Sequence, residues 1–258
     1  MTRVLVVWED SYFQPLDDIL NRAAKNRARS PELPRPMILH HTARSNAAFE
    51  RYVATTWPMA SSRGLPMNPG AINHVVCVVD ADKLSDLLRP QLPPPPSSVT
   101  DIPAWHDNAE QAWNSHLRSK CSPDGPAVST VHGMVLRWSK ESVLLAGYDQ
   151  RAFAQHVDCD ITAPEVEQFL KGCNPRPSDV SGEVFSNSFR NPLRCLRGLR
   201  KAAKLAELPK NSPQFDDALR KLARESLGLV CERAPDVSRV AELIWQLHES
   251  ASASPAHP

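Results

Sequence analysis

The strongest constraint in the chain is an unbroken apolar run, Val75-Val76-Cys77-Val78-Val79, in which four of the five residues are β-branched. A short run that is apolar at every position is typical of a strand whose two faces are both covered. Such strands occur mainly in parallel sheets, because crossover connections place helices on both faces. We therefore predict a buried strand over residues 74–79 in a fold of the α/β class.

Strand and helix patterns alternate ahead of residue 160. Apolar, β-branched segments predict further strands over residues 3–7, 36–40 and 131–138. Apolar residues at helical spacing predict helices over residues 11–25, 46–56, 83–88, 108–120 and 140–145. This alternation predicts an α/β fold with a mostly parallel sheet flanked by helices.

Beyond residue 160 only helical periodicity remains, in segments 164–171, 192–208, 212–227 and 237–250. We predict an α/β domain over residues 1–160, a C-terminal helical extension over 161–250 and a disordered tail over 251–258. With a net charge of +1, the chain as a whole would not attract nucleic acid or an anionic membrane surface. No apolar run reaches about 18 residues and the N-terminus lacks a secretory pattern, so we expect a cytoplasmic protein without membrane contact.

Carboxylates follow two of the predicted strands. Glu9 and Asp10 come directly after the first strand, and Asp80 and Asp82 follow the strand at residues 74–79. Ligands of parallel sheets bind at the carboxyl ends of strands, so we expect these acids to meet at one edge. A hard divalent cation such as Mg²⁺ or Mn²⁺ would relieve their mutual repulsion. The alternative is local, because Asp82 could simply cap a helix that begins near residue 83.

A glutamate after the first strand and an Asp-x-Asp motif after a later strand resemble the Toprim domain of topoisomerases, primases and nucleases. The resemblance implies that Glu9, Asp80 and Asp82 bind Mg²⁺ and support cleavage of phosphodiester bonds. Residues 136–146 are similar to a segment of bacterial Toprim-like nucleases of the overcoming-lysogenisation-defect type, which are encoded beside ATPases in phage-defence loci. In those proteins the segment carries a further glutamate, which implies a role for Glu141. Asp10 stands where many Toprim proteins have glycine, which implies either an added metal ligand or a degenerate site.

A basic cluster lies in the predicted helical extension, with members at three- and four-residue steps that share one helix face. Its members are Arg190, Arg194, Arg197, Lys201 and Lys204. Such a face could follow the phosphate backbone of DNA or RNA. A solvated face, or an interface with an acidic partner, is the alternative. His40, His41 and His74 are candidates for proton transfer, against a purely structural role.

Three functions remain open from the sequence. The first hypothesis is an Mg²⁺-dependent nuclease that hydrolyses DNA or RNA, as the effector of an anti-phage defence system with an ATPase partner. The second is a non-catalytic interaction module that docks a partner protein or nucleic acid. The third is a receiver-like regulatory domain, in which adjacent acids also follow the first strand. The choice between DNA and RNA, the trigger and any homo-oligomer are undetermined at this point.

Overall fold

The computed structural model describes a part of the chain, centred on a parallel sheet. The described residues are 2–9, 36–43, 49–50, 53, 72–81, 84, 87–88, 91–93, 102–121, 130–136, 164, 201, 204–206 and 235–253. The chain divides into two compact units. One comprises Met1–Phe13, Leu20–Leu136 and Arg239–Pro258, and the other comprises Gln14–Ile19 and Arg137–Ser238. Most described residues belong to the first unit, and the fold below is that of this unit.

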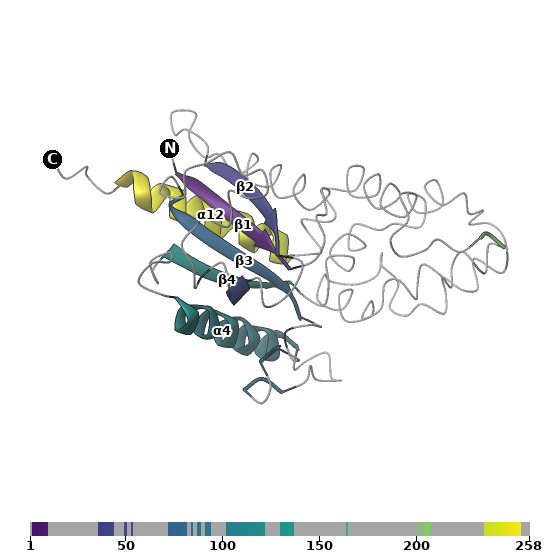
Figure 1. The fold of residues 1–258 in the computed structure, drawn as a ribbon. Coiled ribbons are helices and arrows are strands. Elements are labelled where there is room, and N and C mark those ends of the chain that lie inside the picture. The colour runs from purple at the N-terminus through teal and green to yellow at the C-terminus, as the bar shows by residue number, and fades with distance from the viewer. Residues whose placement is uncertain are drawn as a thin grey trace. The chain divides into compact units, whose positions relative to one another are not determined.

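Four parallel strands form the sheet, in the order β2-β1-β3-β4 (Figure 1). They are β1 (Arg3–Trp8), β2 (Met37–Thr42), β3 (His74–Asp80) and β4 (Val131–Leu136). Trp8 of β1 lies opposite Val78 of β3, and Asp80 lies opposite Leu136 of β4. The predicted α/β class with a parallel sheet and flanking helices is therefore confirmed.

One face of the sheet packs against α4 (Ile102–Lys120). Alternate residues of each strand belong to the same buried cluster as the apolar stripe of this helix, as expected for side chains that alternate between faces. The cluster includes Leu5, Val7, Val75, Cys77, Val79, Val131, Val135, Trp105, Ala109, Trp113 and Leu117. The helix begins at Ile102 rather than at residue 108, and Pro103 is compatible with this start because proline is tolerated in a first helical turn.

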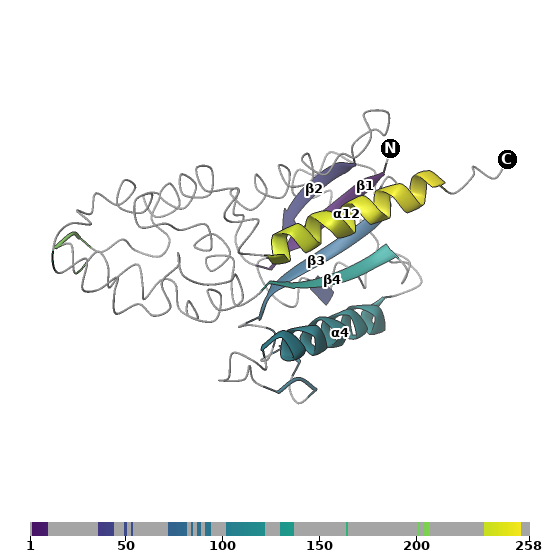
Figure 2. The same ribbon diagram turned by 180° about the vertical axis from the view of Figure 1, so that it is seen from behind.

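The other face is covered by α12 (Pro235–Ala253), which crosses in front of the sheet in Figure 2. Its buried residues recur at helical spacing and form a single stripe. They are Val240, Ala241, Ile244, Trp245 and His248. On this face Val6, Val78 and Leu136 of the strands are almost completely buried. The helix continues to Ala253, three residues into the segment that we expected to be a tail.

Shorter described stretches test two other helix predictions. Residues 49, 50 and 53 are helical, in agreement with the predicted segment 46–56. Lys201 is helical as well, but Lys204 has a φ of 57° and donates its backbone N–H to the carbonyl of Lys201. This left-handed residue ends the helix, and Leu205 and Ala206 have no regular structure. The predicted extension of this helix to residue 208 is therefore wrong.

Candidate functional site

Glu9 and Asp80 meet where the two central strands end. The backbone N–H of Glu9 donates to the carbonyl of Val78 over 3.2 Å, which continues the β1–β3 ladder by one residue. The Glu9 carboxylate Oε2 then accepts the backbone N–H of Asp80 at 3.1 Å. The expected approach of these two strand ends is confirmed, whereas their role as metal ligands stays a prediction.

The bond between Glu9 and Asp80 has a local cause. In a parallel ladder the N–H groups of alternate residues point to the same neighbour, so the N–H of Asp80 points toward β1. The regular strand β1 ends at Trp8. The Glu9 carboxylate takes the place of the next ladder acceptor and satisfies a donor that would otherwise lack a backbone partner. Glu9 therefore closes the end of the β1–β3 ladder, whatever else it binds.

The Asp80 side chain leaves the sheet on the face that α12 covers. Val79 and Ala81 both belong to the cluster on the α4 face. Asp80 lies between them, so its side chain points to the α12 face, on the same side as Val78. In the described part of the chain, no three His, Cys, Asp or Glu side chains gather closely enough to hold a metal ion. Glu9 and Asp80 are thus neighbours through a backbone amide, and their carboxylates do not complete a site by themselves.

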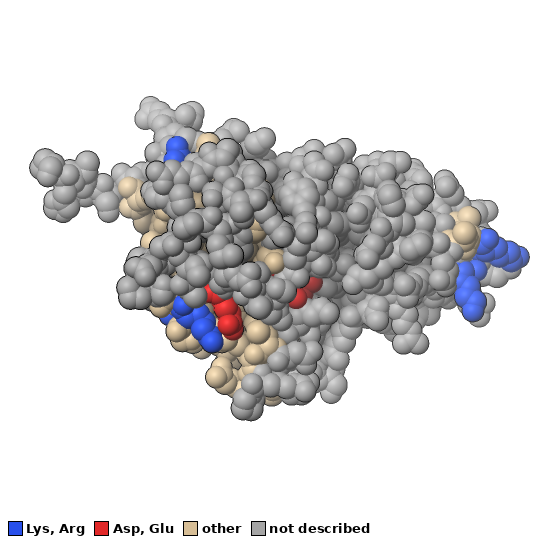
Figure 3. Space-filling model, viewed as in Figure 1, with Lys and Arg blue, Asp and Glu red and all other residues tan. Residues whose placement is uncertain are grey.

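Several predicted site residues lie outside the described residues. They are Asp10, Asp82, Glu141, Arg190, Arg194 and Arg197. Of the basic cluster, Lys201 and Lys204 are described, and both side chains are exposed. Because the helix ends before Lys204, the predicted helix face extends no farther than Lys201. On the face shown in Figure 3, acidic and basic side chains lie next to each other over α4. Separately, Lys120 of α4 pairs with Glu50 at 3.8 Å.

The candidate histidines differ in their distance from the acidic edge. His74 begins β3, so it lies at the opposite end of the strand from Asp80, roughly 20 Å away at the usual rise per residue. This distance removes His74 as a proton donor or acceptor at the acidic edge. His40 lies on β2, where its Nδ1 accepts the Trp8 indole N–H at 3.2 Å and the two rings are nearly parallel. His41 is the next residue of the same strand.

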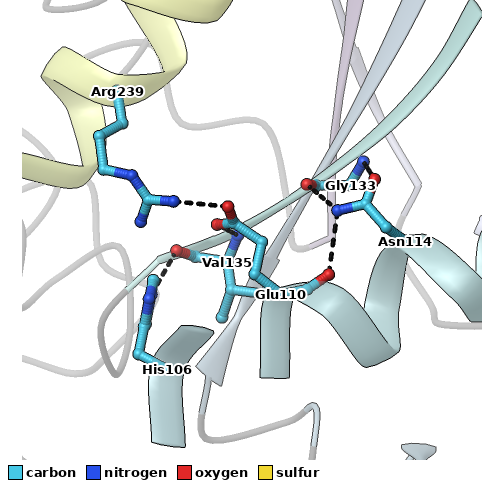
Figure 4. Close-up of polar contacts among 6 residues, drawn as sticks. All are labelled: His106, Glu110, Asn114, Gly133, Val135 and Arg239. Carbon is cyan, nitrogen blue, oxygen red and sulfur yellow. Dashed lines mark hydrogen bonds and ion pairs between the residues drawn. The ribbon is translucent and has the colours of Figure 1, made fainter. Parts of the chain in front are cut away.

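A second polar constellation was not predicted. Figure 4 shows three side chains of α4 that bind the outer edge of β4. Asn114 pairs with both backbone groups of Gly133, since its Nδ2 donates to the carbonyl and its Oδ1 accepts the N–H, each at 2.8 Å. Glu110 Oε2 accepts the N–H of Val135 at 3.3 Å, and His106 Nε2 lies 2.8 Å from the Val135 carbonyl.

The same carboxylate of Glu110 links α4 to α12. Its Oε1 accepts a short hydrogen bond from the guanidinium of Arg239, the residue with which the chain re-enters the first unit. The sequence carries one signal for this arrangement. His106, Glu110 and Asn114 recur every four residues along a helix whose apolar stripe is offset from them. Polar residues at this spacing usually indicate a solvated helix face, so the pattern alone does not reveal a covered sheet edge.

Comparison with known proteins adds no relatives to this description. No protein-family model, no curated protein and no solved structure matches the chain. Among the described residues, no helix has the length and apolar character that crossing a membrane requires.

Proposed function

We propose that the chain is a cytoplasmic Mg²⁺-dependent nuclease of the Toprim type, which hydrolyses phosphodiester bonds of DNA or RNA. The observation that carries the proposal is the bond between the Glu9 carboxylate and the backbone of Asp80 at the carboxyl ends of neighbouring parallel strands. Open parallel sheets bind their ligands at this edge. Glu9 is held there by a fixed partner, which limits the conformations of its carboxylate.

In this proposal Glu9, Asp80 and Asp82 hold the cation, with Asp10 and Glu141 as further candidates. All five are carboxylates, which suits Mg²⁺ or Mn²⁺ and makes a thiol- or imidazole-preferring metal a poor match. A cation bound there would polarise a phosphate oxygen and lower the pKa of a bound water. The contribution of the chain is to orient the carboxylates, and Glu9 already has one oxygen fixed on the Asp80 amide.

We further propose that the chain binds nucleic acid and that an ATPase is the partner subunit. The basic residues expected to contact phosphates are Arg190, Arg194, Arg197, Lys201 and Lys204. Lys201 and Lys204 have exposed side chains, which supports their participation. The role as effector of an anti-phage defence system rests on the Toprim resemblance alone.

The competing function is a non-catalytic interaction module, and one observation favours it. Glu9 already serves as the end cap of the β1–β3 ladder, while Asp80 points to the α12 face. Both acids would then have structural roles, and no cation would be needed to keep them near each other.

The test is cleavage of plasmid DNA and of tRNA in Mg²⁺ or Mn²⁺, with and without the product of the neighbouring gene. We expect Glu9→Gln and Asp80→Asn to lose at least about 100-fold in cleavage rate, since even second-shell partners of metal ligands cost 10–100-fold. Glu249→Gln is the matched control, because it removes an exposed carboxylate from α12. Mg²⁺ should also raise the Tm of the wild type and of the control but not of the two site variants.

Full cleavage by both site variants would refute the nuclease proposal. Absence of cleavage by the wild type under all conditions, together with a Tm that Mg²⁺ does not change, would favour the interaction module.

A further inference from the structure

A pocket of about 610 Å³ opens along the outer edge of β4, between α4 and α12. It lies away from the acidic edge, because its β4 residues are at positions 132–134 and the strand ends at Leu136. The lining that matters for binding consists of Gln111, Ser115, Arg118, His132, Met134 and Leu243. The volume is within the range of 300–1,000 Å³ that small-molecule sites usually occupy.

The polar groups of this pocket divide into occupied and available ones. Asp107, Glu110 and Asn114 also line it. Glu110 and Asn114 are already bonded to β4 and to Arg239, and the exposed carboxylate of Asp107 lies about three turns of α4 before Arg118, roughly 16 Å away at the helical rise. Gln111, Ser115 and Arg118 form a continuous ridge of α4, since they are four and three residues apart. Among the residues that the structure describes, none forms a hydrogen bond or ion pair with these three side chains. The ridge therefore offers a guanidinium, a hydroxyl and an amide to a ligand.

His132 lines the pocket from the β4 side. Its Nε2 is shielded from solvent and has no hydrogen-bond partner among the described residues. The neighbouring ring of His74 lies 5.6 Å away between ring centroids, tilted by 50°. Burial, together with the nearby His74 and Arg118, lowers the pKa of His132 to about 4. The ring is then neutral near pH 7, and a ring nitrogen that faces the pocket can exchange a hydrogen bond with a hydroxyl group.

We propose that this pocket binds a phosphate monoester carried on a ribose-sized body. The phosphate is bound by Arg118, Ser115 and Gln111. The guanidinium matches the geometry of the phosphate oxygens, and the two neutral groups add hydrogen bonds. The neutral ring of His132, which lines the pocket, exchanges a hydrogen bond with a sugar hydroxyl. Met134 and Leu243 contact the carbon atoms of the sugar.

The experiment titrates the full chain with ribose 5-phosphate by isothermal titration calorimetry, with inorganic phosphate and ribose as separate probes. We expect ribose 5-phosphate to bind at least about 10-fold more tightly than either probe, which corresponds to about 1.4 kcal/mol. Arg118→Gln should weaken binding at least about 10-fold, since a charged guanidinium contact to phosphate is lost. Lys120→Gln is the matched control, because it removes the same charge from the same helix two residues away and does not line the pocket. It should leave the Kd within about twofold, as expected for an exposed charge in salt.

The imidazole NMR signals of His132, assigned with the His132→Asn variant, supply a second readout. They should shift when ribose 5-phosphate is added and stay unchanged with Arg118→Gln. No heat of binding at about 10 mM ligand, well above a 1 mM Kd, would overturn the proposal. Equal affinity for inorganic phosphate would overturn it too, because the sugar would not be recognised. Asp80→Asn should bind as the wild type does, which separates this result from that of the nuclease test.

Discussion

At Gly133 the backbone of β4 lies directly beneath the indole ring of Trp113. A Cβ at this position would lie 2.6 Å from Cδ1 of that ring. The indole N–H crosses the strand to donate to the carbonyl of Cys77, the β3 residue that pairs with Gly133, at 3.1 Å. Trp113 also meets the ring of Phe49 edge to face, with centroids 5.3 Å apart. The missing side chain of Gly133 therefore lets a large aromatic residue approach the strand backbone closely.

Gly133→Ala tests this close approach. We expect the free energy of unfolding to fall by about 1–3 kcal/mol, because the added methyl group overpacks a fully buried site. Urea denaturation followed by far-UV circular dichroism gives the value. In a Trp113→Leu background the same substitution should cost clearly less, since the nearest atom that the added methyl group meets, Cδ1 of the indole, is gone. An equal cost in both backgrounds would show that the strain does not come from the indole.

At the scale of elements, α4 seals the exposed edge of the sheet. β4 is an outer strand, and its Gly133 and Val135 turn their backbone groups away from β3. An open edge of this kind is a template for pairing with another chain. Asn114 replaces a neighbouring strand, because its amide binds both the carbonyl and the N–H of Gly133. At Val135, Glu110 binds the N–H and His106 contacts the carbonyl.

Asn114→Ala tests the seal. The substitution leaves the backbone groups of Gly133 without their partner, so we expect a loss of about 1–3 kcal/mol in unfolding free energy. The amide of Gly133 should also exchange faster with deuterium, and analytical ultracentrifugation should reveal some self-association. Gln111→Ala is the matched control on the solvent side of the same helix and should stay within about 0.5 kcal/mol of the wild type. An unchanged Gly133 amide in the Asn114 variant would argue against the seal.

At the scale of the molecule, the first unit is completed by a segment that returns after a long excursion of the chain. The sheet ends at Leu136 in sequence, and the unit resumes at Arg239. The returning helix α12 covers a face on which Val4, Val6 and Val76 are fully buried. Arg239 joins Glu110 at the point of return. The parallel sheet thus depends on a distant segment for the second layer that it needs.

Deleting residues 239–258 tests this dependence. We expect an aggregated or molten product, because several buried valines and the Trp8 ring would face water at about 1.5–3 kcal/mol for each large apolar side chain. Binding of a hydrophobic dye and loss of near-UV circular dichroism would report the change. A chain that lacks only residues 254–258 is the control and should unfold like the wild type. A cooperative unfolding transition in the larger deletion would show that α12 is not required.

Much of the sheet follows from local pattern. A run of five apolar residues predicts a doubly covered strand, and alternation along residues 3–136 predicts parallel pairing, because strand pattern and helix period are properties of short segments. The same reasoning placed Glu9 and Asp80 at one edge of the sheet. It did not foresee the bond from the Glu9 carboxylate to the Asp80 amide, which depends on where β1 leaves its ladder.

The amino-acid sequence by itself determined the elements, their class and the edge at which the acids gather. Only the tertiary structure decided which polar helix face is covered, which helix returns to the sheet, and that a pocket forms between α4 and α12. The reason is that these features depend on contacts between residues far apart in the chain. Asn114 and Gly133 are separated by 19 positions, and Glu110 and Arg239 by 129. No periodicity within a segment records which distant partner its polar side chains will meet.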